Sequence, residues 1–440
     1  MIDDNIALLT DLYELTMLQS YFEEGMNGTA VFDLFVRRLP AQRNYLLACG
    51  LDEVLTYLET LHFSEESLAY LRSLGTFTNA FLDHLRRLRF TGDVYAAPEG
   101  TVVFANEPLV EIVAPLPEAQ LVETYVMNQV HLQTLAASKA ARVVSAAAGR
   151  SVVDFGLRRI HGIDAGIKAA RAFHIAGVQA TSNVLAGRKY GIPVAGTMAH
   201  SYIQAHPDEM RAFGAFVKTF PSTILLVDTY DTLEGVRHVI ELKQRLGADF
   251  LVHGIRLDSG DLAGLATGAR SLLDEAGLKD VQIVASNSLD EYSIRELLAV
   301  GAPIDSFGVG VRMGVSSDAP YLDTAYKLVE YAGVPKMKFS AEKLNLPGRK
   351  QIFRHADHDV LGLQNEPLPG EPLLVKVMEN GRRMEPKGDS MARARTLFRN
   401  QSGRLPRHVF DIEPADPPFP LKVSAGLLSL RDETFGRFRG

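Results

Sequence analysis

The chain has 440 residues, of which 46% are hydrophobic, and its formal net charge is −7. This length suits about three domains, and the acidic balance argues against the basic surface expected for a nucleic-acid or anionic-membrane partner. The sequence has no long apolar run, no secretory signal at its N-terminus and no cysteine besides Cys49, so we expect a soluble cytoplasmic protein.

Residues 1–140 mix helical and strand patterns. Leucines recur every three or four residues over 51–61 and 67–87, which predicts amphipathic helices. Short apolar runs at 94–96, 101–104 and 109–112, separated by proline and glycine, predict strands. We interpret this part as an N-terminal α/β domain.

Residues 141–335 change to a regular alternation of short strands and helices. Predicted strands cover 152–155, 178–181, 194–196, 224–227, 250–257, 282–285 and 304–309. Predicted helices cover 163–176, 207–219, 233–246, 262–276 and 290–300. Alternation of this kind forms parallel β-α units, and nearly unbroken apolar strands suit a sheet that is buried on both faces. A parallel α/β barrel is our first choice, and an open doubly wound sheet is the alternative.

Residues 336–440 lose this alternation and are rich in turn residues, with several prolines between 414 and 420. We expect a smaller, strand-containing C-terminal domain packed on the barrel. One group in it, His355 to Asp359, has residue types that bind metals. Because turn residues bracket this group, a solvated loop is preferred over a zinc site.

Polar residues follow each of the seven predicted strands. In parallel α/β folds the carboxyl ends of the strands lie on one face, where ligand-binding groups collect. Three arginines at these positions can bind phosphate or carboxylate, namely Arg158, Arg159 and Arg256. Gly308 and Gly310 allow close approach of backbone N–H groups to an anion.

Carboxylates accompany these anion-binding groups. Asp258 and Asp261 can hold ribose hydroxyls or a Mg²⁺ ion that carries phosphates. The pattern therefore predicts an enzyme that acts on a phosphosugar or a nucleotide. No G-x-x-x-x-G-K-[ST] motif is present, so a P-loop is excluded.

Six segments in chain order match one known family. They are Thr10 to Met17, Asp154 to Arg159, Gly196 to Ser201, Leu226 to Thr232, Arg256 to Asp261 and Phe307 to Gly310. Together they resemble nicotinate phosphoribosyltransferase. The resemblance implies synthesis of nicotinate mononucleotide from nicotinate and phosphoribosyl pyrophosphate in NAD biosynthesis, coupled to ATP through a phosphohistidine, with Mg²⁺ on the pyrophosphate. It also implies an irregular barrel of the type II phosphoribosyltransferase kind and a homodimer with sites at the subunit interface.

The resemblance assigns the reactive histidine. His200 is expected to be the residue that ATP phosphorylates, with Asp228 as the carboxylate that orients the imidazole and stabilises its developing positive charge. Ser201 is expected among the substrate contacts. A helix-capping or core role is the alternative for His200, although the surrounding motif favours phosphorylation.

The resemblance also assigns the pyridine site. Phe155 is expected to stack on one face of the ring and Tyr13, from the other subunit, on the opposite face. Packing inside its own domain is the alternative for Tyr13. Arg256 is expected to bind the substrate carboxylate and Thr197 to contact the ring. Arg158 and Arg159 are expected nearer the phosphates.

Ser182 bears on substrate choice. The related nicotinamide-using enzymes carry an aspartate at the aligned position, which would repel a carboxylate, whereas a serine is neutral and can donate a hydrogen bond. We therefore expect a preference for nicotinate, with nicotinamide as the alternative substrate.

The remaining assignments concern the ribose and the phosphates. The expected ribose and diphosphate contacts are Asp258, Ser259, Gly260 and Asn287, and the expected phosphate loop is Gly308, Gly310 and Val311. Val311 departs from the family pattern, which usually has threonine there, and so removes a hydroxyl from a phosphate contact. Two other classes stay open: an aldolase or isomerase barrel, which needs a lysine at a strand end that we do not find, and a non-catalytic nucleotide-binding barrel.

Overall fold

The computed structural model describes residues 6–338, 345–384 and 390–437. Within it, residues Lys139–Pro320 form one compact unit, here called the central unit. Its sheet has the strand order β7-β6-β11-β10-β9-β8, and all of the pairings are parallel. The strands are β6 (Ser151–Asp154), β7 (Ala180–Thr181), β8 (Ile224–Leu226), β9 (Gly254–Leu257), β10 (Gln282–Ala285) and β11 (Ser306–Val309). The prediction of parallel β-α units is therefore confirmed.

The prediction of a barrel is confirmed only in part. Strands β7 and β8 are the two edges of the sheet and do not pair with each other in the part of the chain that the structure describes, so the sheet is a curled half-barrel. The expected strand at 194–196 contributes a single bridge, between Val194 and Thr181. Pro193, directly before Val194, has no backbone N–H to donate, and Gly196 follows two residues later, so the pairing does not extend into a longer ladder.

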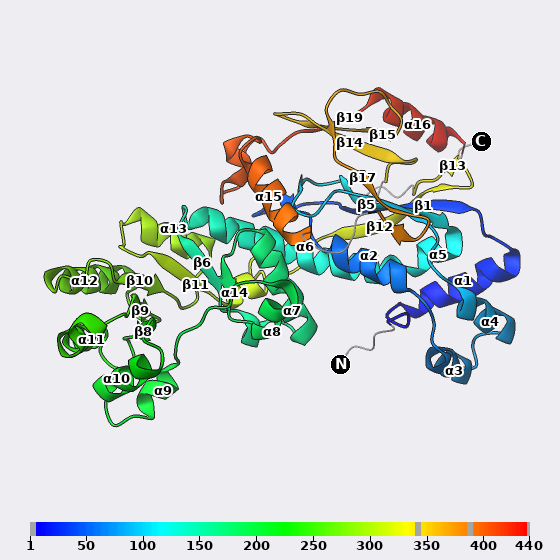
Figure 1. The fold of residues 1–440 in the computed structure, drawn as a ribbon. Helices are drawn as coiled ribbons and strands as arrows, with labels where there is room; N and C mark the ends of the chain where they lie inside the picture. The colour runs from blue at the N-terminus through cyan, green and yellow to red at the C-terminus, as the bar shows by residue number, and fades with distance from the viewer. Residues whose placement is uncertain (1–5, 339–344, 385–389, 438–440) are drawn as a thin grey trace. The chain divides into compact units, whose positions relative to one another are not determined.

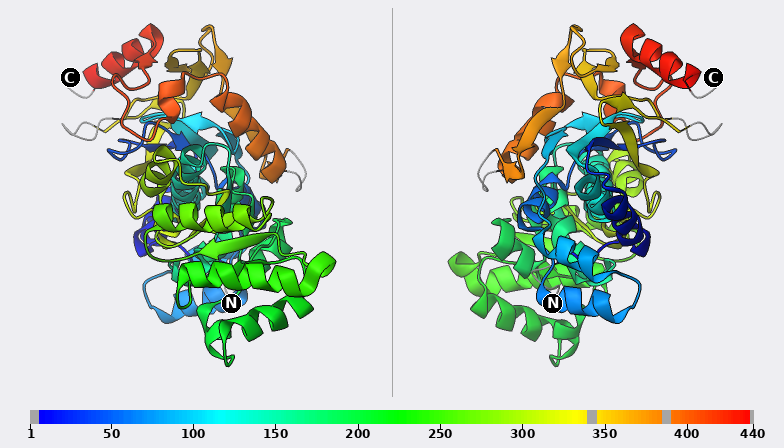
Figure 2. Two further views of the ribbon diagram at one scale, coloured as in Figure 1. Left: turned by 90° about the vertical axis from the view of Figure 1, so that its left-hand side faces the viewer. Right: turned by 90° about the vertical axis from the view of Figure 1, so that its right-hand side faces the viewer.

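Helices connect the strands of the central unit, and α11 and α12 pack side by side (Figures 1 and 2). They are α7 (Ile163–Ile175), α8 (Val184–Tyr190), α9 (His200–Gln204), α10 (Glu209–Thr219), α11 (Thr232–Leu246), α12 (Leu262–Glu275), α13 (Glu291–Ala299) and α14 (Val311–Gly314). Several begin at a polar residue that follows a strand. Asp231 and Asp261 accept hydrogen bonds from backbone N–H groups in the first turns of α11 and α12. Asp261, expected as a possible ribose or Mg²⁺ ligand, is thus a helix N-cap.

Within the central unit, a buried ion-pair network joins the C-terminal part of α6 (Glu123–Ala146), from Lys139 onward, to the start of α13. Lys139 and Arg142, in α6, both contact Glu291 at the start of α13, with Lys139 Nζ 2.5 Å from one carboxylate oxygen and Arg142 Nε 2.9 Å from the other. Lys139 also lies 2.7 Å from Asp318. Since the Glu291 side chain is fully buried, its charge requires these partners. The network stabilises the position of α13, which follows the strand β10.

The other unit, here called the flanking unit, combines Met1–Ser138 with Tyr321–Gly440. Its main sheet has the order β13-β12-β1-β5-β3-β17-β18, and Figure 1 shows blue, cyan, yellow and orange strands side by side in it. They are β1 (Thr29–Val36), β3 (Asp93–Ala96), β5 (Pro108–Pro115), β12 (Thr324–Tyr331), β13 (Val334–Pro335), β17 (Val375–Glu379) and β18 (Arg382–Arg383). Residues 336–440, expected as a separate third domain, fall in the same unit as the N-terminal residues, because β17 pairs with β3.

The flanking unit also contains two smaller sheets. One is β16-β14-β15-β19, formed by β14 (Lys350–Arg354), β15 (Asp359–Leu363), β16 (Glu371–Pro372) and β19 (Leu421–Val423), and the other pairs β2 (Leu46–Leu47) with β4 (Val102–Val103). The helices are α1 (Leu12–Glu24), α2 (Leu51–Thr60), α3 (Glu65–Ser73), α4 (Asn79–Arg87), α5 (Leu116–Leu121), α15 (Ser390–Ser402) and α16 (Ala425–Gly436). The leucine-rich stretch 67–87 thus forms two helices, interrupted near Gly75, which has a left-handed backbone.

The segment His355 to Asp359 is the turn of the hairpin between β14 and β15. His358 Nδ1 contacts the Asp357 carboxylate at 2.8 Å, and Asp359 is buried in an ion pair with Arg354 at 2.6 Å. Among the described residues, no group of three or more His, Cys, Asp or Glu side chains is arranged to hold a metal ion.

Within residues 6–338, 345–384 and 390–437, none of the helices combines the length and the apolar composition that a bilayer crossing needs.

Candidate active site

A cavity of about 640 Å³ lies in the central unit, where the loops after several parallel strands meet. This volume is in the range of small-molecule sites. The residues that line it are Phe155, Leu157, Arg158, Arg159, Ser182, Gly196, Thr197, Met198, Ala199, His200, Ser201, Arg256, Asp258, Ser286, Asn287, Ser288, Gly308, Gly310 and Val311. Most of the residues expected at the site therefore meet around one cavity, although they come from segments far apart in the chain.

His200 begins the short helix α9 and presents its imidazole to this cavity. Its Nδ1 lies 3.2 Å from the Thr229 hydroxyl, and its Nε2 lies 3.5 Å from Oδ2 of Asp258. The expectation that Asp228 contacts the imidazole is wrong, because Asp258 is the carboxylate beside the ring. A carboxylate at this distance stabilises positive charge on the imidazole.

Asp228 instead organises the loop that carries Asp258. The Asp228 side chain is buried, and its Oδ2 accepts hydrogen bonds from the backbone N–H of Asp258 and from the Ser259 hydroxyl, both at 2.7 Å. These two hydrogen bonds hold Oδ2 of Asp228 against the loop after β9, while its Oδ1 is buried without a hydrogen-bond partner. Ser259 and Gly260, expected to contact ribose or diphosphate, do not line the cavity, and Ser259 is engaged with Asp228.

Arg256 supplies a partly buried cation to the cavity. Its guanidinium donates a hydrogen bond to the Thr197 hydroxyl, while its Nε is buried and has no hydrogen-bond partner. Burial lowers the pKa of Arg256, while the negative charges of Asp258 and Asp228 act in the opposite direction. An arginine keeps its charge under such conditions. The site therefore holds an incompletely paired cation, which favours an anionic ligand.

Phe155 forms a flat apolar surface beside these polar groups. Its backbone N–H donates to the Val309 carbonyl at 2.8 Å, and the buried Asp154 side chain anchors the same loop by accepting from Gly156 N and from the Thr181 hydroxyl. Burial raises the pKa of Asp154. The Phe155 ring lies so close to Gly308 that a Cβ there would be 2.4 Å from the ring.

We expect Gly308→Ala to raise the KM for an aromatic substrate by about 2- to 12-fold, which is the range of a lost stacking contact. The added methyl group displaces the Phe155 ring, which is the flexible end of a side chain, so the fold should persist. Gly214→Ala, in α10 and outside the cavity, is the matched control, since a Cβ at Gly214 has no atom within 4 Å. Steady-state kinetics of both variants test this, and an equal change in the two would contradict the role of Gly308.

The cavity is also lined by groups that suit phosphates. Arg158 and Arg159 lie on a 3-10 turn, Leu157–Arg159, and are exposed. Asn287 and Ser288 have positive φ angles of 90° and 49°. Non-glycine residues with such backbones are uncommon and cluster at functional sites.

Val311 lines the cavity and presents no hydroxyl to it. Its neighbour Arg312 forms an ion pair with Asp290 at 2.6 Å and is not among the lining residues, so it does not replace that hydroxyl. Asp258 is the carboxylate of the cavity that suits Mg²⁺, an ion that usually binds through one or two carboxylates together with substrate phosphates.

Two family profiles match the chain. Residues 8–131 match the N-terminal domain of nicotinate phosphoribosyltransferase (NAPRTase), and residues 150–340 match the NAPRTase family. The chain belongs to this family. The family resemblance read from the sequence motifs is thus confirmed.

Relatives of the NAPRTase family are similar over most of the chain. A nicotinate phosphoribosyltransferase of Mycobacterium tuberculosis is 55% identical over 423 residues, which is 95% of this chain and 91% of the relative. One from Bacillus subtilis is 42% identical, covering 83% of this chain and 77% of the relative. Among solved structures, human nicotinic acid phosphoribosyltransferase is 29% identical with a TM-score of 0.85, covering 97% of this chain and 99% of the other.

Sequence reasoning left Ser286, Ser288 and Thr229 unassigned at the site of this NAPRTase-family chain. Ser286 donates a hydrogen bond to Asp258, and Thr229 contacts His200. Ser286 is the first residue after β10 and Thr229 is the third after β8, and this position after a strand is the signal that could have found them. Tyr13 belongs to the flanking unit, where its side chain on α1 is 48% exposed.

Proposed function

We propose that the chain synthesises nicotinate mononucleotide from nicotinate and phosphoribosyl pyrophosphate, coupled to ATP hydrolysis, in NAD biosynthesis. One observation carries the proposal: an incompletely paired arginine, Arg256, shares a cavity with the Phe155 ring and the His200 imidazole. These three groups suit the carboxylate of nicotinate, its pyridine ring and the phosphoryl acceptor, respectively. The names of the relatives support the same assignment.

In the proposed reaction the pyridine nitrogen attacks C1 of the ribose. The new N–C1 bond forms as the bond from C1 to the pyrophosphate oxygen breaks, through a transition state with oxocarbenium character. Arg256 and Phe155 orient the ring, while Arg158 and Arg159 stabilise the negative charge that develops on the leaving group. Mg²⁺ held by Asp258 and the diphosphate oxygens would supply further charge neutralisation.

We assign ATP coupling to His200. A nitrogen of the imidazole takes the γ-phosphoryl group from ATP, with ADP as the leaving group, and later hydrolysis of the phosphohistidine releases inorganic phosphate. Asp258, 3.5 Å from Nε2, stabilises the positive charge of the ring during transfer. The aldolase alternative finds no support, since none of the residues that line the cavity is a lysine.

Product analysis tests the proposal directly. We expect mass spectrometry to detect nicotinate mononucleotide from nicotinate and phosphoribosyl pyrophosphate, and more of it when ATP is present. Nicotinamide should react much more slowly than nicotinate. Ser182 lines the cavity and is neutral, whereas an aspartate at this position would accept a hydrogen bond from the amide group of nicotinamide. Equal turnover of the two substrates would contradict this selectivity, and failure to form any mononucleotide would exclude the function.

We further propose a homodimer in which Tyr13 reaches the pyridine site of the partner subunit. Co-purified mixed dimers of Tyr13→Ala and His200→Ala chains test this. Shared sites predict partial recovery of ATP-stimulated activity, because one of the two sites then has both residues. Activity no higher than that of the parent variants would show that each chain completes its own site.

A further inference from the structure

A second cavity lies entirely within the flanking unit, between its main sheet and the sheet that contains β14, β15 and β19. Its volume is about 480 Å³, which is enough for a small organic molecule. It shares no lining residue with the cavity around His200. Nothing in the proposed reaction uses it.

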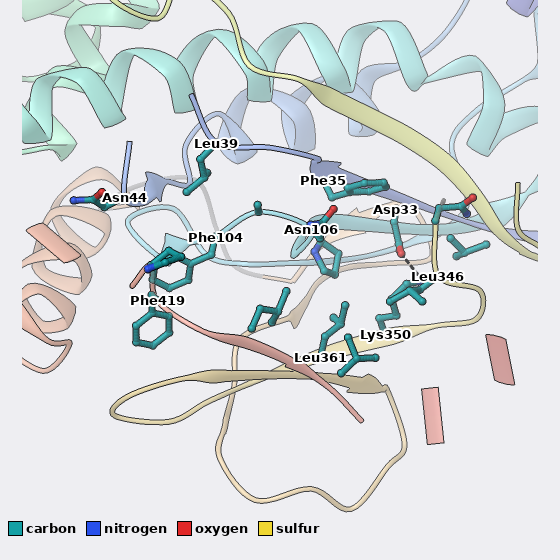
Figure 3. Close-up of a pocket in the computed structure, with 17 residues that line it drawn as sticks. Asp33, Phe35, Leu39, Asn44, Phe104, Asn106, Leu346, Lys350, Leu361 and Phe419 are labelled. Carbon is teal, nitrogen blue, oxygen red and sulfur yellow. Dashed lines mark ion pairs between the residues drawn. The ribbon is translucent and has the colours of Figure 1, made fainter. Parts of the chain in front are cut away.

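One end of this cavity is polar (Figure 3). Asp33 Oδ2 forms an ion pair with Lys350 Nζ at 2.8 Å, and the same Nζ donates to the Gly348 carbonyl at 2.7 Å. The second oxygen of Asp33, Oδ1, has no hydrogen-bond partner, although the residue is 1% exposed. An acceptor left unpaired at such depth is costly, so it marks a place where a donor is missing.

Most of the other lining residues are apolar. The polar ones are Asn44, Asn106 and Asn345, and the side-chain amides of Asn44 and Asn345 are engaged in hydrogen bonds with other parts of the chain. Phe35 and Leu361 lie near the ion pair, while Phe104 and Phe419 stack at the opposite end with ring centroids 4.4 Å apart (Figure 3). Beyond the polar end, such walls give water few hydrogen-bond partners, so ordered water is a poor filling for most of this volume. The lining residues Asn106 and Pro418 are exposed, which gives the cavity a route to solvent.

We propose that this cavity binds an uncharged, flat aromatic molecule whose N–H or O–H group donates a hydrogen bond to Asp33 Oδ1. The polar end is a neutral pair of opposite charges, so a charged ligand would lose its hydration without gaining a free counter-charge. A flat ring fits between the two sheets against the aromatic side chains. A single donor satisfies the one buried acceptor that the cavity leaves open.

Indole and 1-methylindole are matched probes for this proposal, because they share a flat uncharged ring and only indole has an N–H donor. Titration calorimetry with the full chain should show that indole binds at least about 10-fold more tightly than 1-methylindole, as expected for a hydrogen bond to a carboxylate. Equal affinities, or no binding of indole, would overturn the proposal. Tighter binding of benzoate or benzylamine than of indole would overturn the uncharged class.

Two cavity-filling variants locate the binding. Val423→Phe and Ala105→Phe each narrow the cavity, and both positions are only half-buried, so at least one of the variants should fold as judged by circular dichroism. Indole binding should fall at least 10-fold in each folded variant. Phe155→Ala alters the other cavity and should leave indole binding unchanged. Loss of binding in Phe155→Ala alone would place indole at the candidate active site and overturn the proposal.

Discussion

His200→Ala is expected to abolish the stimulation by ATP and to leave a weak ATP-independent synthesis of nicotinate mononucleotide. The ratio of initial rates with and without ATP should fall to unity, because alanine offers no nitrogen that can accept a phosphoryl group. Arg256 and Phe155 are untouched by the change, so the pyridine should still bind. Initial rates at saturating phosphoribosyl pyrophosphate provide the measurement.

Thr229→Val is the matched control for this result. It removes the hydroxyl that lies 3.2 Å from His200 Nδ1 but keeps the imidazole and its neighbour Asp258. We expect weaker stimulation by ATP in this variant, not its loss. Stimulation that survives in His200→Ala would show that ATP acts elsewhere and that the phosphohistidine assignment is wrong.

Arg256→Gln is expected to lower kcat/KM for nicotinate by about 10- to 150-fold, since a hydrogen bond between charged groups contributes about 1.5–3 kcal/mol. Arg256→Lys should recover only part of the loss, because lysine keeps the charge without the planar pair of donors. The loss should appear in the KM for nicotinate and much less in the KM for phosphoribosyl pyrophosphate. Steady-state kinetics with each substrate varied in turn give both values.

Thermal unfolding separates this effect from misfolding. The partly buried Arg256 has an unpartnered Nε, and burial lowers the pKa of its guanidinium. Removing such an incompletely paired charge should leave the melting temperature unchanged or raise it slightly. A KM effect confined to phosphoribosyl pyrophosphate would instead assign Arg256 to the phosphates.

The candidate site shows which features a local sequence pattern can predict and which it cannot. The end of a strand is visible in the sequence as an apolar run followed by polar residues, and this pattern placed Phe155, His200 and Arg256 at one cavity. Which carboxylate faces His200 was not predictable in this way. Asp228 follows β8 and Asp258 follows β9, and only the tertiary contacts show that Asp228 accepts hydrogen bonds from the loop after β9 while Asp258 lies beside the imidazole.

The features of the fold fall into the same two groups, those that a local sequence pattern predicts and those that it does not. By itself, the sequence determined the family and the alternation of parallel strands and helices, because both depend on residue spacing along the chain. Only the tertiary structure decided that the sheet stays a half-barrel, that β17 joins β3, and that Asp33 meets Lys350 at the end of a cavity. These features depend on pairing and side-chain direction between residues far apart in the chain, which a local pattern does not specify.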